Sequence, residues 1–359
     1  MSEYDYPTPP PMVEAIPSKV TNRTSAETDL RRADLGYYIA KCHFRSTCMS
    51  TILSIFDQAA NHSRPELRQR RMNRILVYAG CFNPPHVAHQ RLLEHALQCR
   101  EDLNIIAAIV LPFDDKKVRS KYRRKKDIGV VFTKSQRAKL WQGDPRLHDF
   151  VWVYDRSMEE WYMFQGRLRR AVERDGFSLE FVSLFGSDGV RHGKPSARMS
   201  YGCKQMIISD AGRKAKFITE EGELLRLIRC DPWMTVSADK RHAIWRVIDR
   251  KASVDNALSF KGSSAKPEYY DDLFEETELD FIDKLEGVAI CNRTDFPDEW
   301  ICFIPAGVEG SESQREINST RIRHIIKTYP IKQLHKRLEG KALSPRKLFE
   351  FVQDIRSLH

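Results

Sequence analysis

The sequence predicts an α/β fold in which helices flank a parallel sheet, and three neighbouring segments carry that prediction. ILVYAG at 75–80 and NIIAAIVLP at 104–112 are continuous apolar runs with the length and β-branched content of buried strands. The segment between them repeats apolar residues at helical spacing, at Val87, Leu92, Leu93, Ala96 and Leu97. Strand, helix and strand within about forty residues form a βαβ unit, which needs parallel strands and a right-handed crossover.

The chain before the first strand divides into two parts. Residues 1–36 are rich in proline and polar residues, a composition that buries too little apolar area to offset its ordering entropy, so we expect a disordered tail. Residues 37–73 form an N-terminal extension, expected to be helical because Met49, Ile52 and Phe56 recur at three- and four-residue spacing. We assign residues 74–357 to the α/β domain.

Further strands and helices follow in alternation. We expect a helix at 156–174 and strands at 179–185, 205–210 and 300–305, which together with the first two strands describe a Rossmann-like parallel sheet flanked by helices. Residues 219–297 interrupt this alternation with a Ser/Gly-rich stretch and an acidic run, and we interpret them as an insertion. The last helix begins at SPRKLFEFV, where Ser344 is expected to cap and Pro345 to take the first helical position.

Positive charge is concentrated in one place. Residues 116–126, KKVRSKYRRKK, carry eight basic and no acidic side chains, so removing eight from the formal charge of +10 leaves +2 for the rest of the chain. We therefore predict a local basic loop rather than a nucleic-acid-binding surface, and nucleic acid is not expected as a partner. A solvated segment, a phosphate-facing loop and a nuclear-import signal are the interpretations left open.

Other classes of protein are disfavoured by composition. No apolar run approaches the length of a membrane span, and the N-terminus lacks the pattern of a secretory signal, so we expect a cytoplasmic or nuclear protein without membrane contact. The eight cysteines are scattered without a C-x-x-C pair, which disfavours zinc and disulfide frameworks and favours reduced, mostly buried thiols.

The stretch YAGCFNPPHVAH at 78–89 joins the first strand to the first helix and carries the chemistry. Gly80 permits a tight turn, and the following helix start offers N–H groups and a positive dipole end to an anion. His86 and His89 lie three apart, so they share a helix face and can donate hydrogen bonds and positive charge to a phosphate. Surface histidines and a metal pair are the alternatives, but no third ligand lies nearby, so no metal is expected on these residues.

Residues 317–323 and 184–188 agree with a nucleotide site at this stretch. GCFNPPHVAH at 80–89 resembles the G-x-F-x-P-x-H-x-G-H signature of the nucleotidyltransferase superfamily, and INSTRIR at 317–323 resembles its I-S-S-T-x-x-R motif. LFGSD at 184–188 is similar to the family's G-[AS]-D segment. The chain most resembles nicotinamide or nicotinate mononucleotide adenylyltransferases, including small fungal members. The resemblance covers about residues 74–216 and 298–357 and implies a transferase of NAD biosynthesis that joins ATP to a mononucleotide.

The resemblance also implies roles for individual residues. His86, His89 and Arg323 would be catalytic, with His89 nearest the α-phosphate of ATP. The remaining ATP-binding positions would be Gly80, Phe82, Gly186, Asp188, Ser319, Thr320 and Lys116 or its neighbour Lys117. Cys81, Phe82 and Trp161 would contact the second substrate. Mg²⁺ would arrive with ATP and bridge its phosphate oxygens.

The match weakens at the pyridine end of the expected substrate. The family places a tryptophan where this chain has Ser157, so Trp161, one helical turn later, is the substitute we consider. Asp210 stands where relatives often carry arginine, and Ala88 replaces the glycine of H-x-G-H. Another acceptor, ATP hydrolysis or a nucleotide-binding pseudoenzyme therefore remain alternatives, and the sequence leaves the oligomeric state open.

Overall fold

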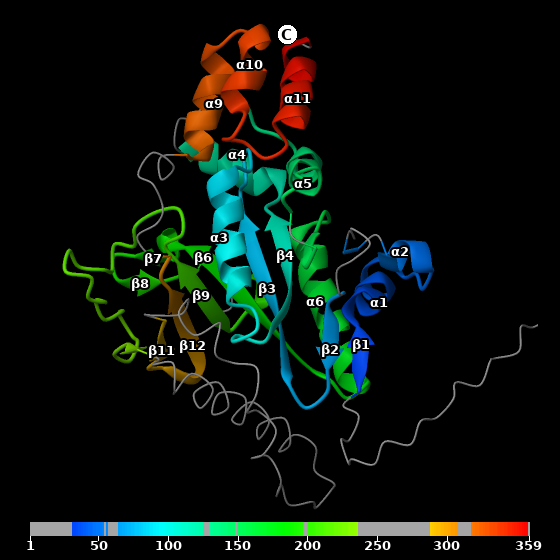
Figure 1. Ribbon diagram of the computed structural model, residues 1–359, viewed down its shortest axis with the longest axis vertical. Coiled ribbons are helices and arrows are strands. Elements are labelled where there is room, and N and C mark those ends of the chain that lie inside the picture. Colours follow the sequence, from blue (N-terminus) through cyan, green and yellow to red (C-terminus); the bar gives the residue numbers. More distant parts are fainter. Residues whose placement is uncertain are drawn as a thin grey trace, which may run out of the picture. The chain divides into compact units, whose positions relative to one another are not determined.

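A sheet of eight strands forms the centre of the fold in the computed structural model (Figure 1). The structure describes residues 31–53, 55–56, 64–124, 129–147, 149–196, 200–235, 288–306 and 317–357 of the chain. The strands are β3 (Met72–Gly80), β4 (Ile105–Pro112), β5 (Val151–Val153), β6 (Ser178–Gly186), β9 (Gln205–Ser209), β10 (Met234–Thr235), β11 (Ala289–Arg293) and β12 (Phe296–Ile304). Their spatial order is β10-β11-β12-β9-β6-β3-β4-β5.

Helices and two small antiparallel strand pairs complete the described elements. The helices are α1 (Leu35–Ile39), η1 (Ala40–Phe44, a π-helix), α2 (Met49–Leu53), α3 (Val87–Gln98), α4 (Asp115–Arg124), α5 (Lys134–Gln142), α6 (Met158–Arg174), the 3₁₀ turns η2 (Ser187–Gly189) and η3 (Ser200–Gly202), α9 (Ser319–Thr328), α10 (Ile331–Leu338) and α11 (Pro345–Ser357). Outside the main sheet, β1 (Arg32–Asp34) pairs with β2 (Glu66–Arg68), and β7 (Val190–Arg191) pairs with β8 (Lys194–Pro195).

The predicted fold class is confirmed. Six neighbouring strands, from β12 through β5, pair in parallel, and only β10 and β11 add antiparallel pairs at one edge. The chain builds outward from β3 to β4 and β5, then returns to the other side of β3 with β6, β9 and β12. Ligands bind beyond the carboxyl ends of strands at such a reversal, which here lies between β3 and β6.

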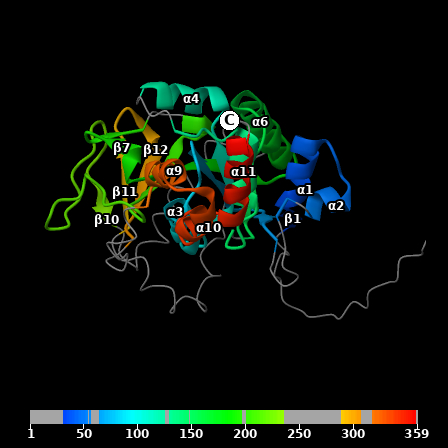
Figure 2. The same cartoon turned by 90° about the horizontal axis from the view of Figure 1, so that it is seen from above.

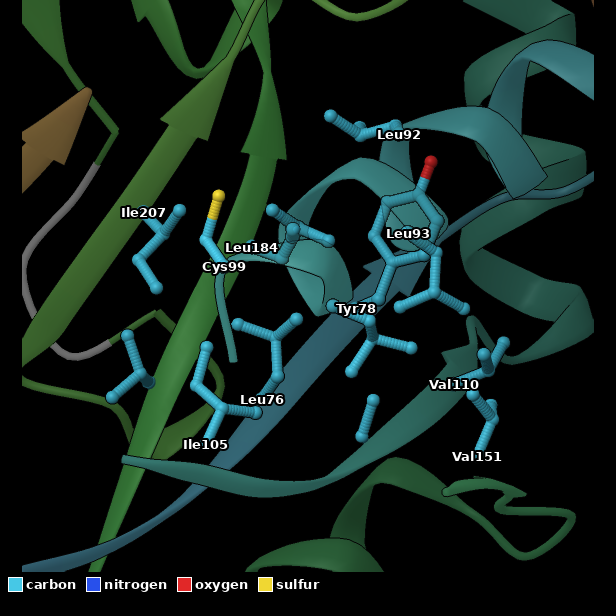
Figure 3. Close-up of a cluster of buried hydrophobic side chains, with 14 of the residues drawn as sticks. Leu76, Tyr78, Leu92, Leu93, Cys99, Ile105, Val110, Val151, Leu184 and Ile207 are labelled. Carbon is cyan, nitrogen blue, oxygen red and sulfur yellow. The ribbon is translucent and has the colours of Figure 1, made fainter. Parts of the chain in front are cut away.

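Alternating side chains of β3 supply both layers of the core. Leu76 and Tyr78 face α3 and pack with Leu93 and other apolar residues of that helix, as Figure 3 shows. Ile75 and Val77 face the opposite layer, which contains α6 and the N-terminal helices. This period of two on a strand buried on both faces explains why its sequence is continuously apolar.

The N-terminal extension packs on the domain. Leu35, Tyr38 and Phe56 are buried in the same cluster as the inner face of α6. Residues 32–36, which we assigned to the tail, form β1 and the start of α1. Residues 1–30 of the predicted tail lie outside the described residues, as do residues 236–287 of the predicted insertion.

Part of the predicted insertion belongs to the sheet. Strands β10 and β11 lie within residues 219–297 and extend the parallel strands by an antiparallel edge. Ala289, Ile290 and Cys291 are fully buried there.

The basic run is a helix, so the predicted local loop is wrong for its described residues. Val118 and Tyr122, four residues apart in α4, are both buried and give the helix one apolar stripe. The lysines and arginines around them are good helix formers.

The last three helices α9, α10 and α11 group together in both views (Figure 1 and Figure 2) and share an apolar cluster with α5. Pro345 begins α11 as predicted, and Ser344 directly before it bonds to α5 and to the loop that follows α5. Its hydroxyl donates to the Leu140 carbonyl at 3.0 Å, and its N–H donates to Asp144 at 2.9 Å, so Ser344 ties α11 to α5. None of the described helices is long and apolar enough to cross a membrane.

Candidate functional site

The loop between β3 and α3 is shaped by a ring that folds back on the backbone. A Cβ at Gly80 would lie 2.7 Å from the Phe82 ring, so only glycine fits there. Phe82 is buried with a φ of 43°, and its ring packs edge-on against Tyr78 and Trp141. Gly80 therefore makes room for the Phe82 ring, whereas the resemblance implied that it contacts ATP.

His86 and His89 stack at the start of α3. Their ring centroids lie 3.5 Å apart with planes 24° apart, and the His86 backbone N–H donates to His89 Nδ1 at 3.2 Å. This bond places the proton of neutral His89 on Nε2, from which it can be donated to an oxygen. The buried Nδ1 of His86 has no hydrogen-bond partner among the described residues.

Both histidines are uncharged at neutral pH, which corrects the expectation that they carry positive charge. Burial, followed by the nearby Arg213 charge, lowers the pKa of His86 to about 3. Burial, followed by His86 and Lys121, lowers the pKa of His89 well below its ordinary value. The neutral pair can therefore offer hydrogen bonds, but no positive charge, to a phosphate.

The second motif lies directly against this loop. Asn318 caps α9 by accepting from the Arg321 N–H at 2.9 Å, and the Ser319 hydroxyl donates to the Pro84 carbonyl at 2.9 Å. Segments more than two hundred residues apart in the chain are thus joined at the carboxyl end of β3.

The Arg323 side chain is buried at this junction and donates hydrogen bonds to its residues. It is 4% exposed, and its Nη1 donates to the Asn83 carbonyl at 2.7 Å and to the Tyr122 hydroxyl at 2.9 Å. Its Nη2 donates to Thr320 Oγ1 at 3.2 Å. Arg323 therefore connects α9, α4 and the loop between β3 and α3 (residues 81–86, the histidine loop), whereas it was expected to clamp phosphate. Thr320 is exposed.

A cavity of about 1010 Å³ opens beside the loop, beyond the carboxyl ends of β3, β4 and β6. Cys81, Phe113 and Ser187, which follow these three strands, line it. Asp188 is the one lining carboxylate among the described residues, against seven basic side chains: Lys117, Lys121, Arg124, Arg191, Arg213, Lys216 and Arg226. Such a lining favours a ligand with several negative charges.

One face of α4 forms the cationic wall of the cavity. Lys117, Lys121 and Arg124 recur at helical spacing and line it, while Lys116 does not. The Lys117 ammonium lies 3.6 Å from the Phe113 ring centroid, and burial lowers the pKa of Lys117. Lys121 Nζ lies 3.5 Å from Cys81 Sγ. Of the two predicted lysines, the structure therefore places Lys117 in the site.

The remaining predicted residues divide between the cavity and the core. Cys81 and Asp188 line the cavity, and Gly186 immediately precedes its η2 wall. Trp161 is fully buried and donates its indole N–H to the Tyr201 carbonyl at 3.0 Å. It has no face for a substrate ring, which corrects its expected stacking role. Ser157 caps α6 by accepting from the Glu160 N–H at 3.1 Å.

Several lining residues escaped the sequence reasoning. Arg213 and Lys216 belong to GRKAK, directly after β9, and their place beyond a parallel strand was a usable signal. Arg191 and Arg226 come from the β7 pair and from the predicted insertion, and no local pattern indicated them. Within the described residues, no group of three His, Cys, Asp or Glu side chains could hold a metal ion.

Comparisons with known proteins give a distant likeness. No family model matches the sequence, and no curated protein matches it. Solved structures of Plasmodium falciparum nicotinic acid mononucleotide adenylyltransferase, one complexed with NaAD and one with APC, are similar to this chain at 12% identity and a TM-score of 0.37. The likeness covers 80% of this chain and 98% of each of those chains.

Proposed function

We propose that this chain is a nucleotidyltransferase that joins the adenylyl group of ATP to the 5′-phosphate of nicotinamide or nicotinate mononucleotide. The observation that carries the proposal is the cavity beyond the carboxyl ends of β3, β4 and β6, where seven basic side chains face one carboxylate. The histidine loop forms its border through Cys81, and the motif resemblance at 80–89 and 317–323 supports the same assignment.

In this reaction the protein has to position the two substrates and to stabilise the negative charge of the transition state. An oxygen of the mononucleotide phosphate attacks the α-phosphorus of ATP in line, the bond to the bridging oxygen breaks, and pyrophosphate leaves. Lys121 and Arg213 offer positive charge to the oxygens on which negative charge grows, and His89 Nε2–H offers a hydrogen bond. The step needs no nucleophilic side chain.

Mg²⁺ fits this proposal as part of the ATP complex. Asp188 is the one carboxylate described in the cavity lining, and oxygen ligands from several residues are what a protein-held Mg²⁺ requires. The ion would neutralise phosphate charge when bound with ATP. The cationic wall of α4 then has less charge to balance, but its role in holding the triphosphate is the same.

The test is a product assay. Purified protein is incubated with ATP, Mg²⁺ and either mononucleotide, and dinucleotide and pyrophosphate are measured by chromatography. We expect both products in equal amounts and a loss of at least about 100-fold in His89→Ala, because preorganised donors contribute on this scale. His324→Ala, an exposed position on α9, is the matched control and keeps the wild-type rate.

Two results would count against the proposal. Consumption of ATP without dinucleotide points to hydrolysis or another acceptor. Nucleotide binding without turnover points to a binding protein, the second candidate, which one observation favours: His86, His89 and Arg323 lie outside the cavity lining, and His86 and Arg323 are buried.

A further inference from the structure

Arg137 in α5 is a wholly buried cation with acceptors from three separate parts of the chain. Its Nε donates to the Phe132 carbonyl at 3.0 Å, and its Nη1 donates to the Cys81 carbonyl at 2.8 Å. Its Nη2 donates to the Phe113 carbonyl and to Asp115 Oδ1, each at 2.7 Å. Bonds from a charged donor to carbonyl and carboxylate oxygens are short and strong, as observed here.

The acceptors lie where β3 and β4 separate to form the cavity. The Phe113 N–H donates to the Gly80 carbonyl at 2.9 Å, which is the last backbone bond between the two chain segments. The next carbonyl on each side, at Cys81 and at Phe113, is held by Arg137. The guanidinium therefore adds one side-chain bridge beyond the end of the strand ladder.

The carboxylate acceptor, Asp115, connects this bridge to the cationic wall. Asp115 is the first residue of α4, whose Lys117 and Lys121 line the cavity. Cys81 and Phe113 line it as well. One buried guanidinium thus contacts the backbone of two lining residues and the start of the helix that presents the lysines.

We propose that Arg137 is a positioning residue for the cavity: it holds the ends of β3 and β4 and the start of α4 in register, so that Lys117 and Lys121 face the anionic substrate. The inference rests on the proposed function only where kcat and KM for transfer are measured; the thermal midpoint and the analogue Kd do not depend on it. Lysine cannot replace it, because a single ammonium lacks the planar fork that reaches Cys81, Phe113 and Asp115 together.

A matched pair of variants tests the proposal. Arg74 is equally buried and donates to Glu180 at 2.9 Å and to the Leu103 carbonyl at 3.2 Å, but it lies at the opposite end of β3. Arg137→Lys and Arg74→Lys therefore remove comparable buried contacts at the site end and at the far end of one strand. For each variant, the thermal midpoint, the Kd of a non-hydrolysable ATP analogue, and kcat and KM for transfer are measured.

We expect Arg137→Lys to raise the analogue Kd about tenfold and to lower kcat/KM about 100-fold, because small displacements of binding groups cost on this scale. Arg74→Lys is expected to lose similar thermal stability while its Kd and kcat/KM stay within about twofold of wild type. If Arg137→Lys does not fold, Asp115→Asn removes only the ion pair and should raise the Kd about threefold.

Equal effects of Arg137→Lys and Arg74→Lys on Kd and kcat/KM would overturn the inference, as would an unchanged Kd in Asp115→Asn. Failure of the proposed function has a different signature. In that case the wild-type protein makes no dinucleotide, while the analogue Kd still decides whether Arg137 positions the cavity.

Discussion

The buried, uncharged state of His86 predicts an acid-sensitive fold. Its pKa is lowered from 6.5 to about 3, so between these values the unfolded chain binds a proton at this position and the folded chain does not. Stability therefore rises with pH across this window and is lost as pH falls below 6.5. Its neighbour His89, whose pKa is also lowered, acts in the same direction.

The size of the effect follows from the window. From pH 6.5 down to pH 4.5, two pH units at about 1.4 kcal/mol each give a loss of about 3 kcal/mol from His86 alone. The variant His86→Asn cannot titrate there, and asparagine is accepted at a helix N-cap, the position of His86 in α3. The variant should be less stable than wild type at pH 7 because its packing is altered. Between pH 6.5 and 4.5, however, its free energy of unfolding should fall by about 3 kcal/mol less than that of the wild type.

Urea unfolding at a series of pH values from 7 to 4.5 measures this slope. His324→Asn, a change at an exposed position on α9, serves as the control and should keep the wild-type slope. A slope in His86→Asn within about 0.5 kcal/mol of wild type over the whole range would refute the reasoning, because burial of an uncharged His86 would then contribute nothing.

Three further perturbations test the site and its support. Lys121→Gln removes a lining charge and should weaken ATP binding about tenfold with a shallower salt dependence; unchanged affinity in a titration would exclude Lys121 from the site. Gly80→Ala places a Cβ 2.7 Å from the Phe82 ring and should lower the free energy of unfolding by about 1–3 kcal/mol, so a neutral result in urea contradicts the packing. Arg323→Met removes the donor to the Asn83 carbonyl and should lower the free energy of unfolding by about 3 kcal/mol. The same urea measurement checks this, and a decrease of less than about 1 kcal/mol would contradict it.

The strands and the first helix were predictable because their signal is local. ILVYAG and NIIAAIVLP are continuously apolar, and β3 and β4 bury both faces, so burial and sequence pattern coincide. The basic run was harder to interpret, since Val118 and Tyr122 are the sole buried residues of α4 as far as Arg124 and charge dominates its composition. Strand β11 was missed because it lies in the predicted insertion, beside an acidic stretch that obscured its short apolar run.

The site was predictable to the level of its two motifs. Their residues at 80–89 and 317–323 pointed to one location, and the Ser319 and Arg323 contacts with Pro84 and Asn83 join them. The individual roles required distances and burial. Ser319 and Arg323 were expected to face phosphate. Instead, Ser319 donates to the Pro84 carbonyl, and Arg323 donates to the Asn83 carbonyl and to the Tyr122 and Thr320 hydroxyls.

By itself, the sequence determined the parallel sheet, the place of the histidine loop at a strand end and the pairing of that loop with a distant motif, because periodicity and motif spacing are properties of the chain. The tertiary structure alone decided that His86 and His89 are neutral and that Trp161 belongs to the core. It also decided that Arg137 braces the cavity and that α4 turns Lys117 and Lys121 toward it. These outcomes depend on which groups surround a side chain and how much water reaches it, and residues far apart in the sequence set both.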